Sequence, residues 1–192
     1  MNELFWGIKT WLYKLFRPAW PFQAILDKEN ENLKILLMQA AVSDKKAADV
    51  GTGTGNVLRF LGQAKLIVGL DFTRSMLVEA KAIFPQAKFL QAKAQTIPLK
   101  SDCLDLITAI GLIEYMSDAV HFLAEASRLI KKGGFLVMSF SPANVWTRMR
   151  AIFGHRVYAW NLEGICRIAV QQNFQLKDFR QSLMQFQVLF RK

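Results

Sequence analysis

A glycine-rich turn that follows an acidic residue is the part of this sequence best suited to bind a ligand. Residues 47–55 read Ala-Ala-Asp-Val-Gly-Thr-Gly-Thr-Gly, so a short apolar run containing Asp49 leads directly into three glycines. Glycine tolerates positive φ and lets a ligand lie against the main chain. We expect a helix from about Asn56, whose free N–H groups would face a polar or anionic ligand. This stretch predicts a nucleotide-type site and does not name the ligand.

A second acid narrows the choice of ligand. Asp71 ends an apolar run, 20 residues after Gly51, where an acid binds the ribose hydroxyls in Rossmann-like folds. The dinucleotide fingerprint requires glycine or alanine at the position held here by Asn56. The Gly-Lys-Ser/Thr ending of a phosphate-binding loop is also missing from this stretch. An adenosyl ligand without a pyrophosphate therefore fits these residues best.

Strands and helices alternate along the chain and must position these residues. The expected strands cover residues 47–50, 66–71, 87–91, 104–110, 135–139, 174–180 and 184–190. The expected helices cover residues 22–41, 56–63, 75–83, 118–131 and 161–173, and a turn is expected at 132–134. This order predicts an α/β fold, a Rossmann-like, doubly wound, mainly parallel seven-stranded sheet with helices on both faces and a C-terminal antiparallel strand.

Five motifs follow one another in this framework. They are residues 48–55, residues 69–77 with the acid, residues 92–99 followed by Asp102 and Asp105, residues 110–118, and residues 126–137, which read Ala-Ser-Arg-Leu-Ile-Lys-Lys-Gly-Gly-Phe-Leu-Val. In this order they resemble class I S-adenosylmethionine-dependent methyltransferases, most closely the small-molecule, ubiquinone/menaquinone methyltransferase-like branch. The resemblance covers roughly residues 45–142 and implies S-adenosylmethionine as the cofactor.

The resemblance also implies which residues contact the cofactor. The glycines would lie against its methionine part, Asp49 would reach its ammonium group unless it only caps the turn, and Asp71 would accept both ribose hydroxyls. Phe72 and Met76 would border the adenine unless they belong to the core. The full expected set is Asp49, Gly51, Thr52, Gly53, Gly55, Asp71, Phe72, Met76, Ala94, Gln95, Ile110 and Gly111. Lys93 departs from the family, because that position usually holds an acid that accepts from the adenine amino group, and lysine carries only donors.

Methyl transfer from a sulfonium needs alignment and exclusion of water, and a general base is optional. The candidates that would face the methyl group are Glu114 and Tyr115 after the fourth strand, and His155 and Tyr158 after the fifth. Each of them could instead be structural or line the substrate site. The Asn/Asp-Pro-Pro-Tyr/Phe signature of nucleic-acid and protein amine methylation is missing after the fourth strand, which favours a small molecule.

The charge distribution suggests what approaches this site. The chain carries a net charge of +10, and residues 119–192 alone carry +8, from 11 Lys and Arg against 3 Asp and Glu. Two segments, 4–17 and 144–160, combine basic with aromatic residues. We therefore divide the chain into an N-terminal amphipathic helix or lid at 1–21 and a methyltransferase domain at 22–192, with a basic aromatic insertion at 143–160. The first helix could simply pack on the domain, and the insertion could be a solvated helix face.

These features favour a lipophilic acceptor, such as a quinone precursor or a phospholipid amine, and contact with an anionic membrane surface through residues 4–17 and 144–160. A methyltransferase for a soluble metabolite, an RNA methyltransferase and a non-catalytic S-adenosylmethionine-binding protein remain alternatives. Nucleic acid is the least favoured partner, because no RNA-binding module is recognisable.

Cysteine and histidine usage also bears on location and metals. Cys103 and Cys166 predict two buried thiols in a reducing cytoplasm. His121 and His155 are too far apart for a metal-ligand pair, so we expect no metal. The sequence lacks a convincing signal peptide and a run of about 20 apolar residues. A cytoplasmic protein with membrane association is the resulting expectation.

Overall fold

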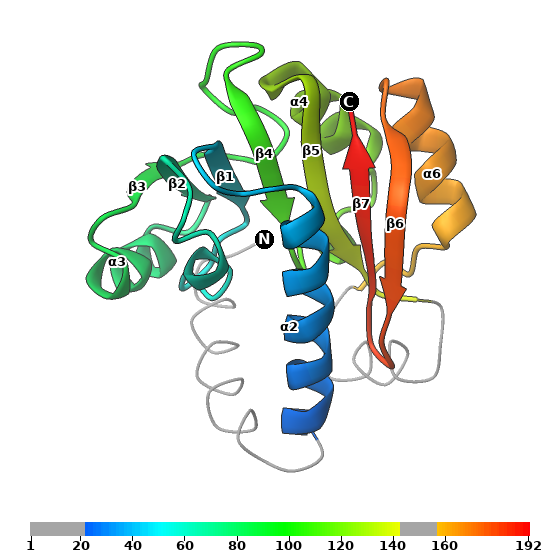
Figure 1. Ribbon diagram of the computed structural model, residues 1–192, viewed down its shortest axis with the longest axis horizontal. Helices are drawn as coiled ribbons and strands as arrows, with labels where there is room; N and C mark the ends of the chain where they lie inside the picture. The colour runs from blue at the N-terminus through cyan, green and yellow to red at the C-terminus, as the bar shows by residue number, and fades with distance from the viewer. Residues whose placement is uncertain (1–21, 143–156) are drawn as a thin grey trace.

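Seven strands form one mixed sheet in the described part of the chain. The computed structural model describes residues 22–142 and 157–192 (Figure 1), so the segment 4–17, most of the insertion 143–160, and His155 lie outside the described residues. The strand order is β3-β2-β1-β4-β5-β7-β6, with β7 antiparallel to both of its neighbours and the other pairs parallel. The strands are β1 (Lys46–Val50), β2 (Leu66–Asp71), β3 (Lys88–Gln91), β4 (Leu104–Ala109), β5 (Ile130–Phe140), β6 (Gln175–Gln181) and β7 (Phe186–Arg191). The predicted fold class is confirmed.

Helices cover both faces of this sheet. They are α2 (Phe22–Gln39), α3 (Arg74–Ile83), α4 (Val120–Leu129) and α6 (Leu162–Gln171). The buried apolar side chains of α2 form one core with the sheet, and those of α4 and α6 form a second core. In Figure 1, α2 lies in front of the sheet and α4 behind it. The central strands β1, β2 and β4 are buried at nearly every position, which is why they read as continuous apolar runs.

The structure contradicts the predicted helix over 56–63. Only a short 3-10 helix, η1 (Leu58–Phe60), forms there, with hydrogen bonds such as Leu58 N to Gly55 O that join residues three apart. Ten residues separate Gly55 from β2, and they must return along the length of a strand. Ten residues of α-helix span about 15 Å, whereas a six-residue strand is about 20 Å long, so the chain takes the more extended 3-10 form and turns. The expected α-helical N-terminus behind the glycine turn does not exist.

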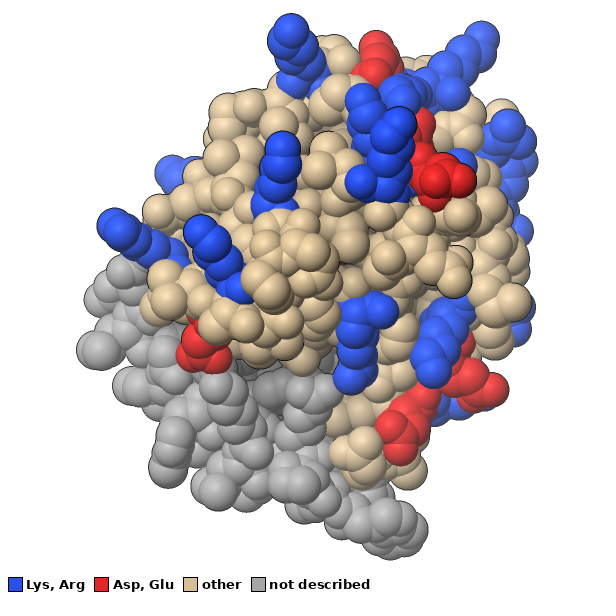
Figure 2. All heavy atoms as spheres, turned by 60° about the vertical axis from the view of Figure 1, so that its left-hand side comes forward, with Lys and Arg blue, Asp and Glu red and all other residues tan. Residues whose placement is uncertain are grey.

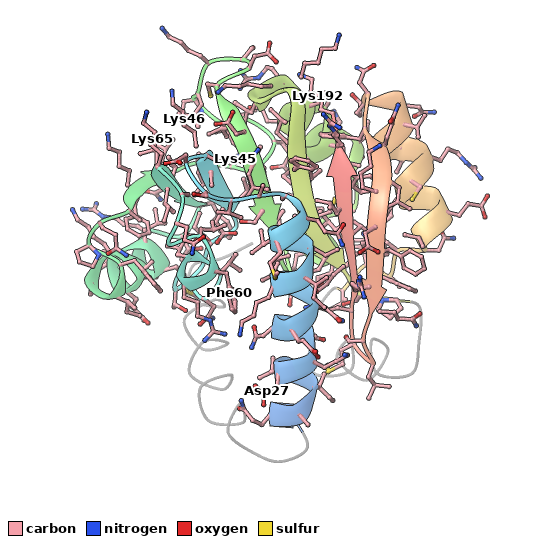
Figure 3. All side chains as sticks on the ribbon, in the orientation of Figure 1. Asp27, Lys45, Lys46, Phe60, Lys65 and Lys192 are labelled. Carbon is pink, nitrogen blue, oxygen red and sulfur yellow. The ribbon has the colours of Figure 1, made fainter. Side chains whose placement is uncertain are left out.

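The boundary between α4 and β5 also differs from the prediction. β5 begins at Ile130 instead of residue 135, and the expected turn at 132–134 is part of it. The C-terminal residue of the chain supplies the reason, because Gly133 N–H donates to Lys192 O (2.7 Å) and Lys192 N–H donates to Gly134 O (3.0 Å). The ammonium group of Lys192 (Figure 3) also donates to Ile130 O at 2.7 Å. A register shift of β5 against β4 near Leu104 accommodates the extra length.

Positive charge also gathers outside the C-terminal third. Three lysines lie where β1 and β2 begin, at the end of the sheet opposite the glycine turn: Lys45, Lys46 and Lys65 (Figure 3). Figure 2 shows Lys and Arg side chains standing out along the upper part of this side of the molecule.

Among the described residues no helix is long and apolar enough to cross a bilayer. Cys103 and Cys166 are free thiols that are half-buried, and not buried as expected.

Candidate cofactor site

The glycine turn after β1 has the geometry that its sequence implies. Gly51, Gly53 and Gly55 all have positive φ, at 74°, 52° and 88°. A Cβ atom on Gly51 would lie 2.9 Å from Leu112 Cδ1, and one on Gly55 would lie 2.9 Å from the ring of Phe84. A Cβ atom on Gly53 would have no atom of a described residue within 4 Å. Gly51 and Gly55 are thus required by packing, whereas the main chain at Gly53 borders open space that a ligand can approach.

Asp71 holds this turn in place from the end of β2. Its Oδ2 accepts the Gly53 N–H at 2.9 Å, and its Oδ1 accepts the Thr73 N–H at 2.8 Å. Sequence reasoning assigned this acid to ribose and missed both main-chain contacts. A carboxylate offers about four lone-pair sites, so each oxygen of the half-buried side chain can still accept from a ligand hydroxyl. Asp71 therefore links the glycine turn to the start of α3 while keeping capacity for a diol.

Asp49 lies beneath the turn and is only 1% exposed. Its register partner on β4 is Thr108, whose hydroxyl donates to Asp49 Oδ1 at 2.6 Å. Asp49 Oδ2 and the hydroxyl of Thr52 make no hydrogen bond to any described residue. Burial raises the pKa of Asp49 to about 6, and the charge of Asp71 adds to the rise. The hydrogen bond from Thr108 opposes it, and so does the nearby Thr52 hydroxyl, although that hydroxyl does not have hydrogen-bond geometry to the carboxylate. A buried carboxylate oxygen without a donor suits a cationic or hydrogen-donating ligand group. In the sequence, Thr108 could have been recognised as the hydroxyl-bearing residue within the mostly apolar strand β4.

The turn after β4 borders the same region. Gly111 has φ of 69°, and a Cβ atom there would have no described atom within 4 Å. Its N–H donates to Ser139 Oγ on β5 at 2.8 Å, a contact that the sequence did not indicate. Ile110 is half-buried against the core under α2. Gly111 is thus a second main-chain position that faces open space.

The remaining predicted cofactor residues lie just after β2, on α3 and in the loop after β3. Phe72 is 37% exposed and Met76 is 9% exposed on α3. The loop after β3 starts beside them, because Ala92 N–H donates to Asp71 O at 3.0 Å. Ala94 is half-buried and Gln95 exposed in this loop. The side chain of Lys93 is exposed, and its main chain pairs with Thr96 in an isolated bridge.

Three of the four candidate catalytic residues, Glu114, Tyr115 and Tyr158, lie close together after β4. Glu114 is 1% exposed within the 3-10 helix η2 (Ile113–Tyr115), and Tyr115 is half-buried at its end. The half-buried Tyr158 donates its main-chain N–H to Glu114 O at 2.7 Å. Trp160 Nε1 donates to Ile113 O at 3.1 Å. The structure thus brings the last residues of the insertion onto the turn after β4, while His155 lies outside the described residues.

Known proteins share both the sequence and the fold of this region. Residues 48–138 match a family described as "Methyltransferase domain". The ubiquinone/menaquinone biosynthesis C-methyltransferase of Campylobacter jejuni is 34% identical over 103 residues, which cover 50% of this chain and 44% of that protein. The tRNA U34 carboxymethyltransferase of Dichelobacter nodosus is 30% identical over 155 residues, covering 71% of this chain and 48% of that protein.

The chain contains a class I methyltransferase domain. A solved structure with the same fold is magnesium protoporphyrin IX methyltransferase from Synechocystis with bound SAH, which superposes with a TM-score of 0.78 at 15% identity and covers 97% of this chain and 94% of that one. This chain spans about half the length of the curated relatives it matches.

The cofactor of class I methyltransferase domains is S-adenosylmethionine, and the residues of this domain fit it. The donor-free Asp49 Oδ2 and Thr52 hydroxyl suit an ammonium group, and Asp71 keeps lone pairs for a ribose diol. Gly53 and Gly111 leave room against the main chain. At the adenine end that the resemblance predicts, Lys93 stands at the position where an acid is expected. Among the described residues, no group of His, Cys, Asp and Glu could hold a metal ion.

Proposed function

We propose that this chain is an S-adenosylmethionine-dependent methyltransferase that transfers the methyl group to a small, lipophilic acceptor by in-line displacement. The observation that carries this is Asp49, a carboxylate 1% exposed whose Oδ2 has no hydrogen-bond donor among the described residues. It lies beneath a glycine turn whose Gly53 is bound to the ribose acid Asp71. A ligand that carries an ammonium group and a ribose diol would satisfy both carboxylates.

The residues of the site would act mainly by positioning. Bound S-adenosylmethionine supplies an electrophilic methyl group on its sulfonium. Asp49 would hold the ammonium group, and Asp71 would hold the ribose hydroxyls while fixing Gly53. The turn around η2, with Glu114 and Tyr115, and the neighbouring Tyr158 would exclude water and line the acceptor. The proton of the acceptor would pass to solvent or to one of these side chains.

Two observations support a lipophilic acceptor. The relative from Campylobacter jejuni is named for ubiquinone and menaquinone biosynthesis. A further relative, from Thermotoga maritima and 28% identical over 123 residues, is named a demethylmenaquinone methyltransferase. The basic aromatic segment 144–160 follows β5, and substrates of open α/β sheets bind outside the carboxyl ends of the strands. We infer a quinone precursor or a phospholipid amine as the acceptor, and a cytoplasmic protein that contacts the membrane.

A thermal-shift assay with S-adenosylmethionine, S-adenosylhomocysteine and NAD tests the cofactor. The two adenosyl compounds should raise the melting temperature and NAD should not. A methyl-release assay over lipid, quinol and RNA extracts then tests the acceptor. Turnover with RNA alone would favour the second candidate, an RNA methyltransferase, for which the Dichelobacter relative is the specific support. Binding without turnover on any extract would favour a non-catalytic role.

Sedimentation with liposomes tests the membrane contact. Vesicles that contain anionic lipid should pull down the full chain, and deletion of residues 1–17 should weaken this binding. Neutral vesicles serve as the control. Equal sedimentation with and without vesicles would exclude the membrane contact.

A further inference from the structure

A salt-bridged pair on α4, Glu125 and Arg128, holds the loop that connects β3 to β4. This loop, residues 92–103, contains one isolated bridge and otherwise has no strand or helix. Glu125 Oε1 accepts the Ile97 N–H at 2.6 Å, and Arg128 Nη2 donates to Ile97 O at 2.9 Å. The pair therefore satisfies both main-chain groups of one residue, as a neighbouring strand does in a hydrogen-bonded pair. The Ile97 side chain is 3% exposed and belongs to the core under α4.

Arg128 fixes more of the loop than Ile97. Its Nε and Nη2 each lie 2.8 Å from an oxygen of Glu125, and its Nη1 donates to Leu99 O at 2.8 Å and to Ser101 Oγ at 3.3 Å. The hydrogen bond from Arg128 lowers the pKa of Glu125. A planar guanidinium can serve these acceptors together, whereas a lysine ammonium cannot.

The other end of the loop starts at the cofactor site. Asp71 is the register partner of Gln91, the last residue of β3, and Ala92 N–H donates to Asp71 O at 3.0 Å. Gln91 Nε2 also donates to Phe72 O at 2.9 Å. Only residues 93–96 separate the anchor on β2 from the anchor at Ile97. Movement at Ile97 would therefore pass directly to these four residues.

We propose that Glu125 and Arg128 are positioning residues for the cofactor. By holding Ile97 they keep the main chain of Ala94 and Gln95 beside Asp71, where the adenosine part of the cofactor would bind. This inference rests on the proposed cofactor site. Neither side chain needs to touch the cofactor, because both act through the loop.

The test replaces the guanidinium while keeping its charge. Arg128→Lys retains a cation beside Glu125 and loses the fork that reaches Ile97 O and Leu99 O. The matched control is Arg167→Lys on α6, where Arg167 forms an exposed i,i+4 pair with Glu163. Isothermal titration measures the Kd of each protein for S-adenosylhomocysteine and for 5′-methylthioadenosine. We expect Arg128→Lys to weaken both ligands about tenfold and by the same factor, and Arg167→Lys to change them less than twofold.

The comparison between ligands separates an effect on the adenosine part of the site from an effect on its amino-acid part. The loop borders the adenosine part, which both ligands share, so a loss confined to S-adenosylhomocysteine would overturn the inference. Unchanged affinity in Arg128→Lys would overturn it as well. If the unsubstituted protein binds neither ligand, the proposed function itself fails.

Hydrogen exchange supplies a readout that is independent of the ligand. Amides in residues 92–103 should exchange faster in Arg128→Lys, while those in residues 46–55 keep their protection. Equal loss in both segments would mean a purely structural role and would overturn the inference. Should Arg128→Lys melt below the assay temperature, Glu125→Gln gives the same comparison, because its amide oxygen can still accept from Ile97 but no longer pairs with both arms of Arg128.

Discussion

Thr108 and Asp49 form a buried hydrogen bond between two central strands, with the hydroxyl donating to Oδ1 at 2.6 Å. Thr108 is 0% exposed and Asp49 is 1% exposed. The two residues meet because they are register partners in the parallel pair of β1 and β4. This contact satisfies one oxygen of the carboxylate and leaves Oδ2 without a donor from the described residues. Thr108 thus orients the carboxylate of Asp49, whose ionisation costs free energy in the absence of a ligand.

The stability of the apoprotein should report this cost. Burial raises the pKa of Asp49 to about 6, and the unfolded value is about 3.9. The folded state therefore binds a proton more tightly, so this group makes the protein less stable as the pH rises from about 4 to about 6. We expect Asp49→Asn to gain about 3 kcal/mol in unfolding free energy relative to the unsubstituted protein over this range. Urea denaturation of both proteins from pH 4 to pH 7 measures the difference, and a constant difference would contradict the raised pKa.

Cofactor binding should show the opposite dependence on pH. A ligand ammonium beside Oδ2 favours the ionised carboxylate, so the affinity for S-adenosylhomocysteine should rise by roughly tenfold from about pH 5 to about pH 7. Asp49→Asn should bind more weakly and with little dependence on pH. Titration calorimetry at several pH values measures both. A flat profile in the unsubstituted protein would mean that Asp49 does not face the ammonium group.

Gly51 and Gly53 should respond differently to the same added methyl group. At Gly51 a Cβ atom would meet Leu112 Cδ1 at 2.9 Å and the φ is 74°, so Gly51→Ala should cost about 2–4 kcal/mol of stability through overpacking and backbone strain. At Gly53 the φ is 52° and the space is open, so Gly53→Ala should cost about 1 kcal/mol. Its methyl group would occupy the space of the cofactor and weaken binding about tenfold or more. Urea denaturation and calorimetry on both variants make the comparison; equal binding by Gly53→Ala and the unsubstituted protein would move the cofactor away from this turn.

Lys93 offers a gain-of-affinity test. Its side chain is exposed, so Lys93→Asp should change stability by no more than about 0.5 kcal/mol. It would supply the carboxylate that the family pattern carries at this position, and we expect the affinity for S-adenosylhomocysteine to increase about three- to tenfold. Lys93→Ala is the control, since it removes the cation without adding an acceptor. Weaker binding by Lys93→Asp than by Lys93→Ala would show that residue 93 does not border the adenine amino group.

Much of the fold and of the glycine turn follows from local sequence. Buried parallel strands need apolar residues on both faces, so the strands at 66–71 and 104–109 can be recognised from the sequence alone. Three closely spaced glycines after a strand predict positive φ, and all three have it. Alternation of strands and helices then sets the doubly wound order, and an acid at the end of the second strand falls beside the glycine turn.

Only the tertiary structure decided which distant groups complete these elements. Ten residues of α-helix would be too short to cover the return path to β2, so η1 forms instead. Main-chain hydrogen bonds with Lys192 hold Gly133 and Gly134 in β5. Thr108 faces Asp49 and Arg128 holds Ile97 across gaps of 59 and 31 residues. Secondary structure is coded by composition and periodicity within a few residues, whereas these contacts depend on strand register and on the path of the chain through space. The sequence therefore determined the type of site, and the packing of the sheet determined which side chains orient it.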